Sequence, residues 1–121
     1  MQVVFSARCR YFMHAQSVDL RKGFDTLSGL VTNEFLQSPV SGDVFIFLNR
    51  PRNRIKLLHW QGDGFAIYYK RLEQGTYEFP KAEVRNNSIQ LSHHHLQFIL
   101  DGIILSGIKK RKRFELAIVD N

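Results

Sequence analysis

Two runs of basic residues carry the most prominent chemistry in this sequence. One runs from Arg50 to Lys56 and holds four bases and no acid, and the other is the unbroken basic block from Lys109 to Arg113. Guanidinium and ammonium groups gathered in this way attract nucleic acids through their phosphates, without regard to base sequence. The formal net charge of +6 agrees with such a role. The alternative is that both runs only keep the protein in solution.

Aromatic residues lie close to further bases between these two runs. Trp60 falls in the run that begins at Arg54, and Tyr69 falls in the run that also contains Lys70 and Arg71. On a sheet, bases can hold phosphates while aromatic rings stack on nucleobases. The competing interpretation is that the rings form core and the bases sit at strand ends. The candidate nucleic-acid-binding residues are Arg50, Arg52, Arg54, Lys56, Trp60, Tyr69, Lys70, Arg71, Lys109, Lys110, Arg111, Lys112 and Arg113.

Residues that could hold a metal ion do not converge in this sequence. His93, His94 and His95 are consecutive, and consecutive side chains on a helix point about 100° apart. We therefore expect an exposed first helical turn there. Metal-dependent nucleases bring two or three carboxylates together, and the spacing of the acidic residues gives no sign of this. A small nuclease or strand-transfer enzyme is the alternative, which a cluster of Asp19, Asp25, Asp43 and Asp63 would revive.

Candidate nucleophiles lack the neighbours that would activate them. The sequence has no Gly-x-Ser-x-Gly elbow, no phosphate-binding glycine loop and no cysteine pair. Cys9 has no base nearby in sequence, so we expect a small buried apolar residue. Tyr68, Tyr69 and Tyr77 could act as strand-transfer nucleophiles, but aromatic residues in strands more often pack on the sheet. We predict a protein without catalytic activity, metal or cofactor.

Length and residue order indicate one domain in the cytoplasm. A chain of 121 residues is an ordinary single domain, in which residues 106–121 form a basic C-terminal extension. A lone cysteine suits a reducing compartment. Arg8 and Arg10 follow a short apolar run, the reverse of a signal peptide. No apolar stretch reaches the ~20 residues that cross a bilayer, so we expect no membrane partner.

The strongest helical pattern covers Asp19–Gln37. Leu20, Phe24, Leu27, Val31 and Phe35 recur at spacings of three and four, which is one face of a helix. The helix is expected to start at a cap formed by Ser17 or Asp19 and to stop at Ser38 and Pro39.

The pattern then changes to that of strands. Asp43–Arg50, Arg54–Gln61 and Phe65–Leu72 are rich in aromatic and β-branched residues, and Asp63-Gly64 favours a hairpin turn because glycine supplies a positive φ. These runs predict a three-stranded antiparallel meander. Tyr77–Phe79 and Arg8–His14 are candidates for two further strands.

A second helix of about ten residues is predicted from Ser92. Leu96, Ile99, Leu100 and Ile103 face inward, and Gly102 stands where a helix commonly ends. Beyond it, Phe114, Leu116 and Ile118 alternate as in an edge strand. The fold class is therefore α+β: a single domain with an antiparallel β meander of three to five strands packed with two main helices.

The order of several motifs resembles a known family. They are Asp19-Leu20-Arg21-Lys22-Gly23-Phe24-Asp25-x-Leu27, the run from Ser41 to Arg50, Arg54 to Leu58, Asp63-Gly64-Phe65, Tyr68 to Glu73, Gly75, Pro80 and, loosely, Leu96 to Gly102. Together they resemble the TnpB-type accessory protein of the IS-sixty-six class of bacterial insertion sequences, over roughly residues 10–105. The family commonly finishes in a short basic tail, and Phe114 to Val119 extend beyond that pattern.

The resemblance implies a role in transposition beside a separate, larger transposase that carries the catalytic acids. It assigns no catalytic residue to this chain, in agreement with the search above. Two hypotheses follow. In the first, a non-enzymatic accessory factor binds the DNA of the element ends through its basic clusters. In the second, a protein–protein adaptor docks onto the transposase through its aromatic sheet or its first helix without contacting DNA.

Overall fold

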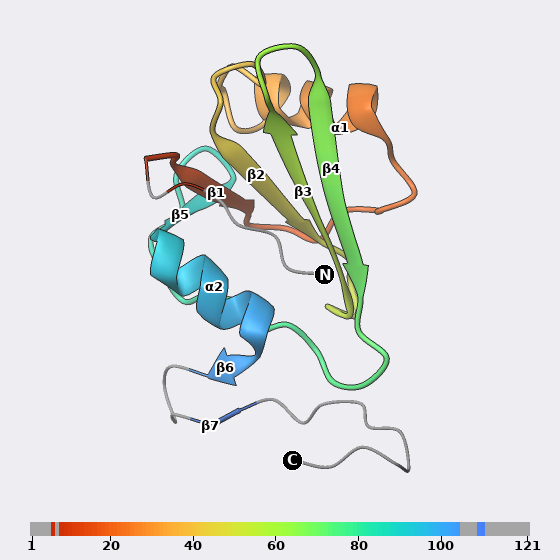
Figure 1. The fold of residues 1–121 in the computed structure, drawn as a ribbon, viewed down its shortest axis with the longest axis vertical. Coiled ribbons are helices and arrows are strands. Elements are labelled where there is room, and N and C mark those ends of the chain that lie inside the picture. The colour runs from red at the N-terminus through yellow and green to blue at the C-terminus, as the bar shows by residue number, and fades with distance from the viewer. Residues whose placement is uncertain (1–5, 7, 105–108, 111–121) are drawn as a thin grey trace.

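The computed structural model describes residue 6, residues 8–104 and residues 109–110, with side chains up to residue 102. Its centre is a five-stranded sheet in the order β4-β3-β2-β1-β5 (Figure 1). The strands are β1 (Tyr11–His14), β2 (Val44–Leu48), β3 (Arg54–Trp60), β4 (Phe65–Arg71) and β5 (Ser88–Leu91). With the helices α1 (Phe24–Asn33) and α2 (His93–Asp101), this is the α+β fold that the sequence predicts.

The predicted meander is present in β2, β3 and β4, which pair antiparallel in sequence order. The strand predicted near the N-terminus is also present, as β1, but it runs parallel to β2 and antiparallel to β5. The sheet is therefore mixed. A parallel pair requires a crossover connection, and the segment containing α1 supplies it between β1 and β2.

The first helix is shorter than the apolar pattern suggests. It begins at Phe24 after Gly23, which provides no side-chain cap. Asp19 does not cap it, because its carboxylate accepts hydrogen bonds from the backbone and guanidinium of Arg21. Leu20 and Phe35 are nevertheless buried, as the periodicity predicts, although both lie outside the helix. Phe24 is the exception, with 49% of its surface exposed.

The second helix starts and ends as predicted. The Ser92 hydroxyl accepts a hydrogen bond from the backbone N–H of His95, and Gly102 ends the helix with a φ of 80°.

We expect Ser92→Ala to lower the free energy of unfolding by about 1 kcal/mol, because one N–H of the first turn loses its acceptor. Urea denaturation measures this, and Ser92→Asp, which keeps an acceptor, should restore most of the loss.

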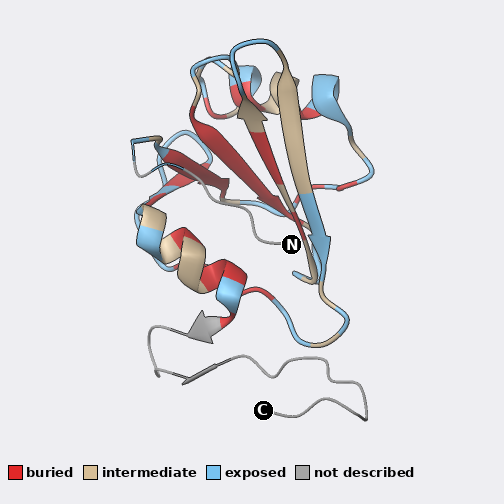
Figure 2. Ribbon diagram, in the orientation of Figure 1, coloured by how far each residue is buried: buried red, intermediate tan, exposed pale blue. Residues whose placement is uncertain are grey.

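Alternate residues of the strands contribute to two hydrophobic cores, one on each face of the sheet. On one face, Phe12, Phe45 and Phe47 pack with Leu27 and Val31 of α1. The opposite core joins residues of the same strands to α2, and comprises Tyr11, Met13, Val44, Ile46, Leu48, Ile55, Leu57, Tyr77, Ile89, Leu91, Leu96, Ile99 and Leu100. The central strand β2 is buried throughout, while β4 becomes exposed toward its end (Figure 2).

Three details differ from the sequence interpretation. Tyr77–Phe79 form no strand: Tyr77 is buried and donates one backbone hydrogen bond to Arg52, and Pro80 has no N–H with which to extend a ladder. Strand β5 was not predicted, because it is only four residues long; Asn86 and Asn87, both at positive φ, turn the chain into it. In the β3–β4 turn the positive φ belongs to Gly62 and not to Gly64.

Two short strands follow α2. Strand β6 (Ile103–Ile104) pairs antiparallel with β7 (Lys109–Lys110). The edge strand expected at Phe114, Leu116 and Ile118 lies outside the described residues. Neither helix of the described part of the chain is long and apolar enough to cross a membrane.

Candidate nucleic-acid interface

The turn between β2 and β3 places two candidate bases at one end of the sheet. Asn49 fixes this turn, since its side-chain oxygen accepts from the backbone N–H groups of Asn53 and Arg54 and its side-chain nitrogen donates to Asn53. Arg52 adopts a left-handed conformation with a φ of 60°. Its guanidinium lies 4.8 Å from the centre of the Phe79 ring, a cation–π contact that orients it. Arg50 is exposed on the same turn.

Beside this turn, two arginines face each other across neighbouring strands. Arg54 of β3 is the register partner of Arg71 of β4, so both side chains leave the same face of the sheet. Like charges directly opposite each other in an antiparallel pair destabilise it. Arg71 is paired with Glu73 at 2.8 Å, and both of these side chains are more than half exposed. Glu73 offsets the charge of Arg71 alone, so the charge of Arg54 remains in excess at this position.

The next pair on the same face adds a lysine and an aromatic ring. Lys56 is opposite Tyr69, and its ammonium lies 4.9 Å from the centre of the tyrosine ring. The Lys56 ammonium also donates to the backbone oxygen of Lys22 at 2.9 Å, and Arg54 donates to the Tyr69 hydroxyl at 3.3 Å. Tyr69 is 48% exposed. Arg54, Lys56, Tyr69 and Arg71 therefore form one connected group, which we call the basic cluster.

Other candidate residues lie away from the basic cluster. Lys70 alternates with Tyr69 and Arg71, so it leaves the opposite face, on which α2 packs. Trp60 shares the face of Lys56 but lies at the far end of β3, where it packs edge-on against Phe65 at 5.0 Å. Lys109 and Lys110 form the short strand β7. Arg111, Lys112 and Arg113 lie outside the described residues.

Sequence reasoning missed two bases on the α1 side. Lys22 accepts the Lys56 hydrogen bond through its carbonyl, and Arg21 precedes it, exposed and paired with Asp19 at 2.7 Å. That contact and the guanidinium of Arg21 hold the pKa of the Asp19 carboxyl well below its usual range. The signal was present as two adjacent bases immediately before the first helix.

Among the four candidate aspartates, Asp19 and Asp43 each have an arginine partner. Asp43 accepts from the backbone N–H of Arg10 at 3.0 Å and from its guanidinium at 2.8 Å. Burial alone would raise the pKa of the Asp43 carboxyl, but the hydrogen bonds and the charge of Arg10 outweigh it and lower that pKa. No three histidine, cysteine, aspartate or glutamate side chains gather as a metal site within the described part of the chain. Cys9 is only partly buried, not fully buried as expected, and this burial, followed by the charge of Asp43, raises the pKa of its thiol and disfavours the thiolate form.

The lowered pKa of Asp43 predicts a pH dependence of stability. A carboxyl whose pKa is lower in the folded state than in the unfolded state stabilises the fold above its unfolded pKa of about 4, and loses that contribution as pH falls through the folded value. Asp43→Asn should therefore destabilise the protein at pH 7 and flatten the fall in stability below about pH 4. Thermal unfolding of both proteins from pH 7 to pH 2.5 measures this. Parallel curves would contradict it.

Comparison of the sequence with known proteins places the chain in a family. The sequence model of the IS66 Orf2 like protein family matches residues 9–110. The chain belongs to this family. Two relatives from Sinorhizobium fredii (strain NGR234) are similar over most of their length. The uncharacterized protein y4jC is 28% identical over 102 residues, 84% of this chain and 86% of its own. The uncharacterized protein y4hO is 30% identical over 94 residues, 78% and 80% respectively. No solved structure matches this chain.

Membership in the IS66 Orf2 like family confirms the resemblance drawn from the motifs between residues 19 and 80. It implies an accessory role in the transposition of an insertion sequence. The match includes the turn at Arg50, the whole basic cluster and both strands that carry it. The ion pairs of Asp19 with Arg21 and of Asp43 with Arg10 give these two carboxylates a structural role.

Proposed function

We propose that this IS66 Orf2 like protein is a non-enzymatic transposition factor that binds DNA of the element ends directly, through the basic cluster and the neighbouring β2–β3 turn. Arg54, Lys56 and Arg71 contact phosphates, and Arg50 and Arg52 extend the contact along the backbone. Tyr69 offers an exposed ring edge for a sugar or base. The basic block at residues 109–113 adds phosphate contacts in the same proposal, as do Lys70 and Trp60 from their separate positions.

The opposition of Arg54 and Arg71 carries the proposal. Two guanidiniums in register repel each other in the free protein, and Lys56 on the same face increases the local positive charge. A phosphate placed between them replaces repulsion with two charge-assisted hydrogen bonds. The contacts of Lys56 and Arg54 with Tyr69 hold these side chains before any ligand arrives. Less side-chain entropy is then lost on binding.

The test is a mobility-shift titration of purified protein, with no other protein present, on a duplex that carries the end of the insertion sequence. We expect a shifted complex at low salt and its loss when salt is raised. Absence of any complex at low salt would overturn direct binding. A complex that forms only after the transposase is added would favour the adaptor role instead.

A further inference from the structure

The two edge strands of the sheet differ in how much backbone they leave open. Strand β4 is seven residues long, contains no proline, and pairs with β3 without a bulge from Phe65 to Arg71. Figure 1 shows it as the outermost strand on its side of the sheet. No strand of the described part of the chain pairs with its outer side. A long, regular edge of this kind is a template for pairing with another strand.

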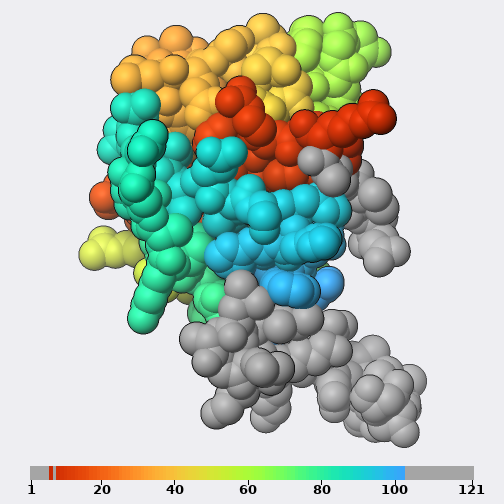
Figure 3. Space-filling model, turned by 90° about the vertical axis from the view of Figure 1, so that its left-hand side faces the viewer, coloured from red at the N-terminus to blue at the C-terminus, as the bar shows by residue number. Residues whose placement is uncertain are grey.

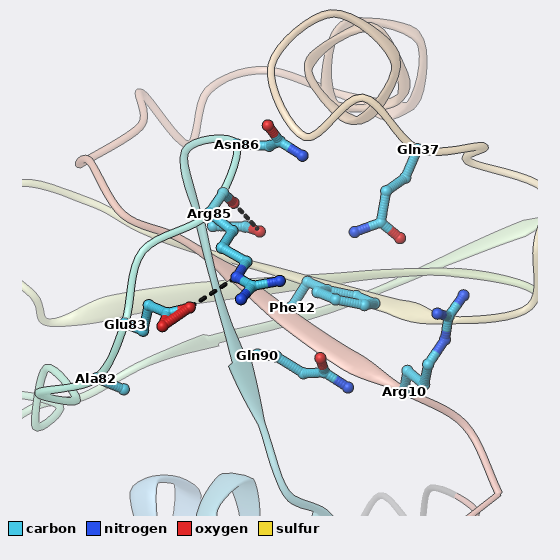
Figure 4. Close-up of a pocket in the computed structure, with 9 residues that line it drawn as sticks. Arg10, Phe12, Gln37, Ala82, Glu83, Arg85, Asn86 and Gln90 are labelled. Carbon is cyan, nitrogen blue, oxygen red and sulfur yellow. Dashed lines mark hydrogen bonds and ion pairs between the residues drawn. The ribbon is translucent and has the colours of Figure 1, made fainter.

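The opposite edge, at β5, is protected by the chain itself. Strand β5 has only four residues, and Ser88 at its start exchanges backbone hydrogen bonds with Arg85 at 2.8 and 2.9 Å. The segment before β5 lies beside this strand, where Glu83 pairs with Arg85 (Figure 4). Residues 81–87 form part of the surface on this side (Figure 3). Little of the β5 backbone is therefore left for another chain.

The hydrogen bonds at the two ends of the β3–β4 hairpin determine which β4 residues face outward. Leu72 donates to Asn53 at 2.7 Å just beyond one end, and Gln61 accepts none but donates to Gly64 at 2.9 Å at the other. Hydrogen-bonded pairs alternate along an antiparallel ladder, so the even-numbered residues of β4 bond to β3. The odd-numbered residues turn their backbone N–H and C=O groups to the open edge. These outward residues are Phe65, Ile67, Tyr69 and Arg71.

The outward residues are arranged symmetrically about Tyr68. A second β4 can lie antiparallel to the first with the two Tyr68 residues opposite each other. Phe65 of each copy is then opposite Arg71 of the other, and Ile67 is opposite Tyr69. Every outward N–H and C=O group of the strand meets a partner in this register. A shift of the register leaves an outward residue unpaired at one end, so the edge is complementary to itself over its whole length.

The charges of β4 agree with antiparallel pairing of two copies. Its two bases, Lys70 and Arg71, are both at its C-terminal end, and antiparallel pairing separates these ends. Lys70 then lies opposite Ala66 of the other copy, and Arg71 lies opposite Phe65, whose ring attracts a cation. Like charges directly opposite each other would destabilise the pair, and this register contains none. A parallel arrangement would bring the same bases together.

Partly exposed apolar side chains lie along the same edge. Phe65 and Ile67 pack against the core under α1, and Tyr68 packs against the opposite core, but all three are only half-buried. Side chains that lie opposite each other in an antiparallel pair contact each other. A second copy therefore covers Ile67 with Tyr69 and covers each Tyr68 with the other. This removes apolar surface from water, which favours association.

We infer that the protein forms a two-fold symmetric dimer through its β4 edges, in which two five-stranded sheets join into one continuous sheet. The two-fold axis passes between the Tyr68 residues, perpendicular to the sheet, so the same face of both copies points the same way. Arg54, Lys56, Tyr69 and Arg71 of the two copies then lie on one face, on either side of the axis. Binding of one duplex by both basic clusters is a consequence that rests on the proposed function. The dimer itself does not.

Cysteine cross-linking tests the register. In this dimer the two Tyr68 residues form a non-hydrogen-bonded pair with Cα atoms about 4.5 Å apart, which is within the range of a disulfide. Tyr68→Cys, in the full chain with Cys9→Ala, should therefore give a covalent dimer on a non-reducing gel after mild oxidation. The matched control is Lys70→Cys on the same face. Its two thiols belong to residues about 13 Å apart, so it should stay a single chain.

Sedimentation velocity measures the assembly without an introduced thiol. We expect the wild-type chain to sediment at micromolar concentration with twice the mass of one chain. Ile67→Pro removes an N–H that β3 does not use, so the hairpin should form while dimer affinity falls at least about tenfold. Gln90→Pro is the matched control. It removes an outward N–H from β5, since Ala15 donates to Asn87 and bonded pairs alternate from there, and it should leave the dimer intact.

Three results would each overturn the inference. They are a wild-type chain that stays monomeric at every concentration, equal cross-linking of the two cysteine variants, and equal dimer affinity of the two proline variants. If Ile67→Pro does not fold, the cysteine pair still decides the register. None of these measurements contains DNA, so the mobility-shift test of the proposed function succeeds or fails separately.

Discussion

Replacing Arg54 and Arg71 together by glutamine is expected to lower affinity for element-end DNA by at least about a hundredfold at moderate salt. Each arginine is proposed to make one charge-assisted phosphate contact, and such contacts contribute about 1.5–3 kcal/mol. Fluorescence anisotropy on a labelled duplex measures the change. The fold should tolerate the substitutions, because both side chains reach solvent and their mutual repulsion disappears with them.

The matched control removes the same two charges elsewhere. Lys81 and Arg85 are both exposed before β5, outside the proposed contact surface. Lys81→Gln with Arg85→Gln should lower affinity less than the cluster variant, through net charge alone. Equal losses from both double variants would show that affinity follows total charge and not the basic cluster. The free energies of unfolding of all three proteins should agree within about 1 kcal/mol.

Phe35→Ala is expected to produce the largest loss of stability, about 3–5 kcal/mol. The Phe35 side chain is fully buried beyond the end of α1, with its ring 5.6 Å from that of Phe45 and 5.8 Å from that of Phe47. Truncation leaves a cavity between helix and sheet and removes both aromatic contacts. Chemical denaturation measures the loss, which is a large share of the 5–15 kcal/mol typical of a domain.

Phe24 offers the control for this prediction. It lies in the same periodic pattern but is 49% exposed, so Phe24→Ala should cost less than about 1 kcal/mol. If both variants lose the same stability, the packing of α1 described above is incorrect. Neither variant changes a base, so where Phe35→Ala remains folded its DNA affinity should match that of the wild type.

The strongest local signals of the sequence predicted their elements well. Runs of aromatic and β-branched residues identified β2, β3 and β4, and the Ser92 cap with Gly102 bounded α2 within a residue. Both depend on contacts within a few residues. The helix start at Phe24 was missed because Asp19 has two local uses, as a cap or as a partner of Arg21, and the ion pair prevails. Propensity alone does not separate those outcomes.

The pairing of strands that are distant in sequence could not be predicted from the sequence. That β1 runs parallel to β2, and that β5 completes the sheet, depends on contacts between residues more than thirty positions apart. The candidate site shows the same division. Side chains alternate along a strand, so the spacing of Arg54, Lys56 and Trp60 is enough to place them on one face, in agreement with the register. The strand register was needed to know which bases lie opposite each other on β3 and β4. Only the register shows that Arg54 lies opposite Arg71.

The proposed aromatic docking surface for a partner must also be revised. Phe45 and Phe47 are fully buried beneath α1 and cannot contact another protein. Tyr69 is half exposed, but it belongs to the basic cluster. Phe45 and Phe47 therefore drop out of the adaptor hypothesis.

Direct DNA binding through the basic cluster is tested most directly by the salt dependence of affinity. Each phosphate contact on duplex DNA contributes about −0.9 to the slope of log K against log salt concentration. Contacts from Arg54, Lys56 and Arg71 alone predict a slope of about −2.7 or steeper for the wild type, and one shallower by about 1.8 for the double glutamine variant. A slope near zero, or the same slope for both proteins, would contradict the account.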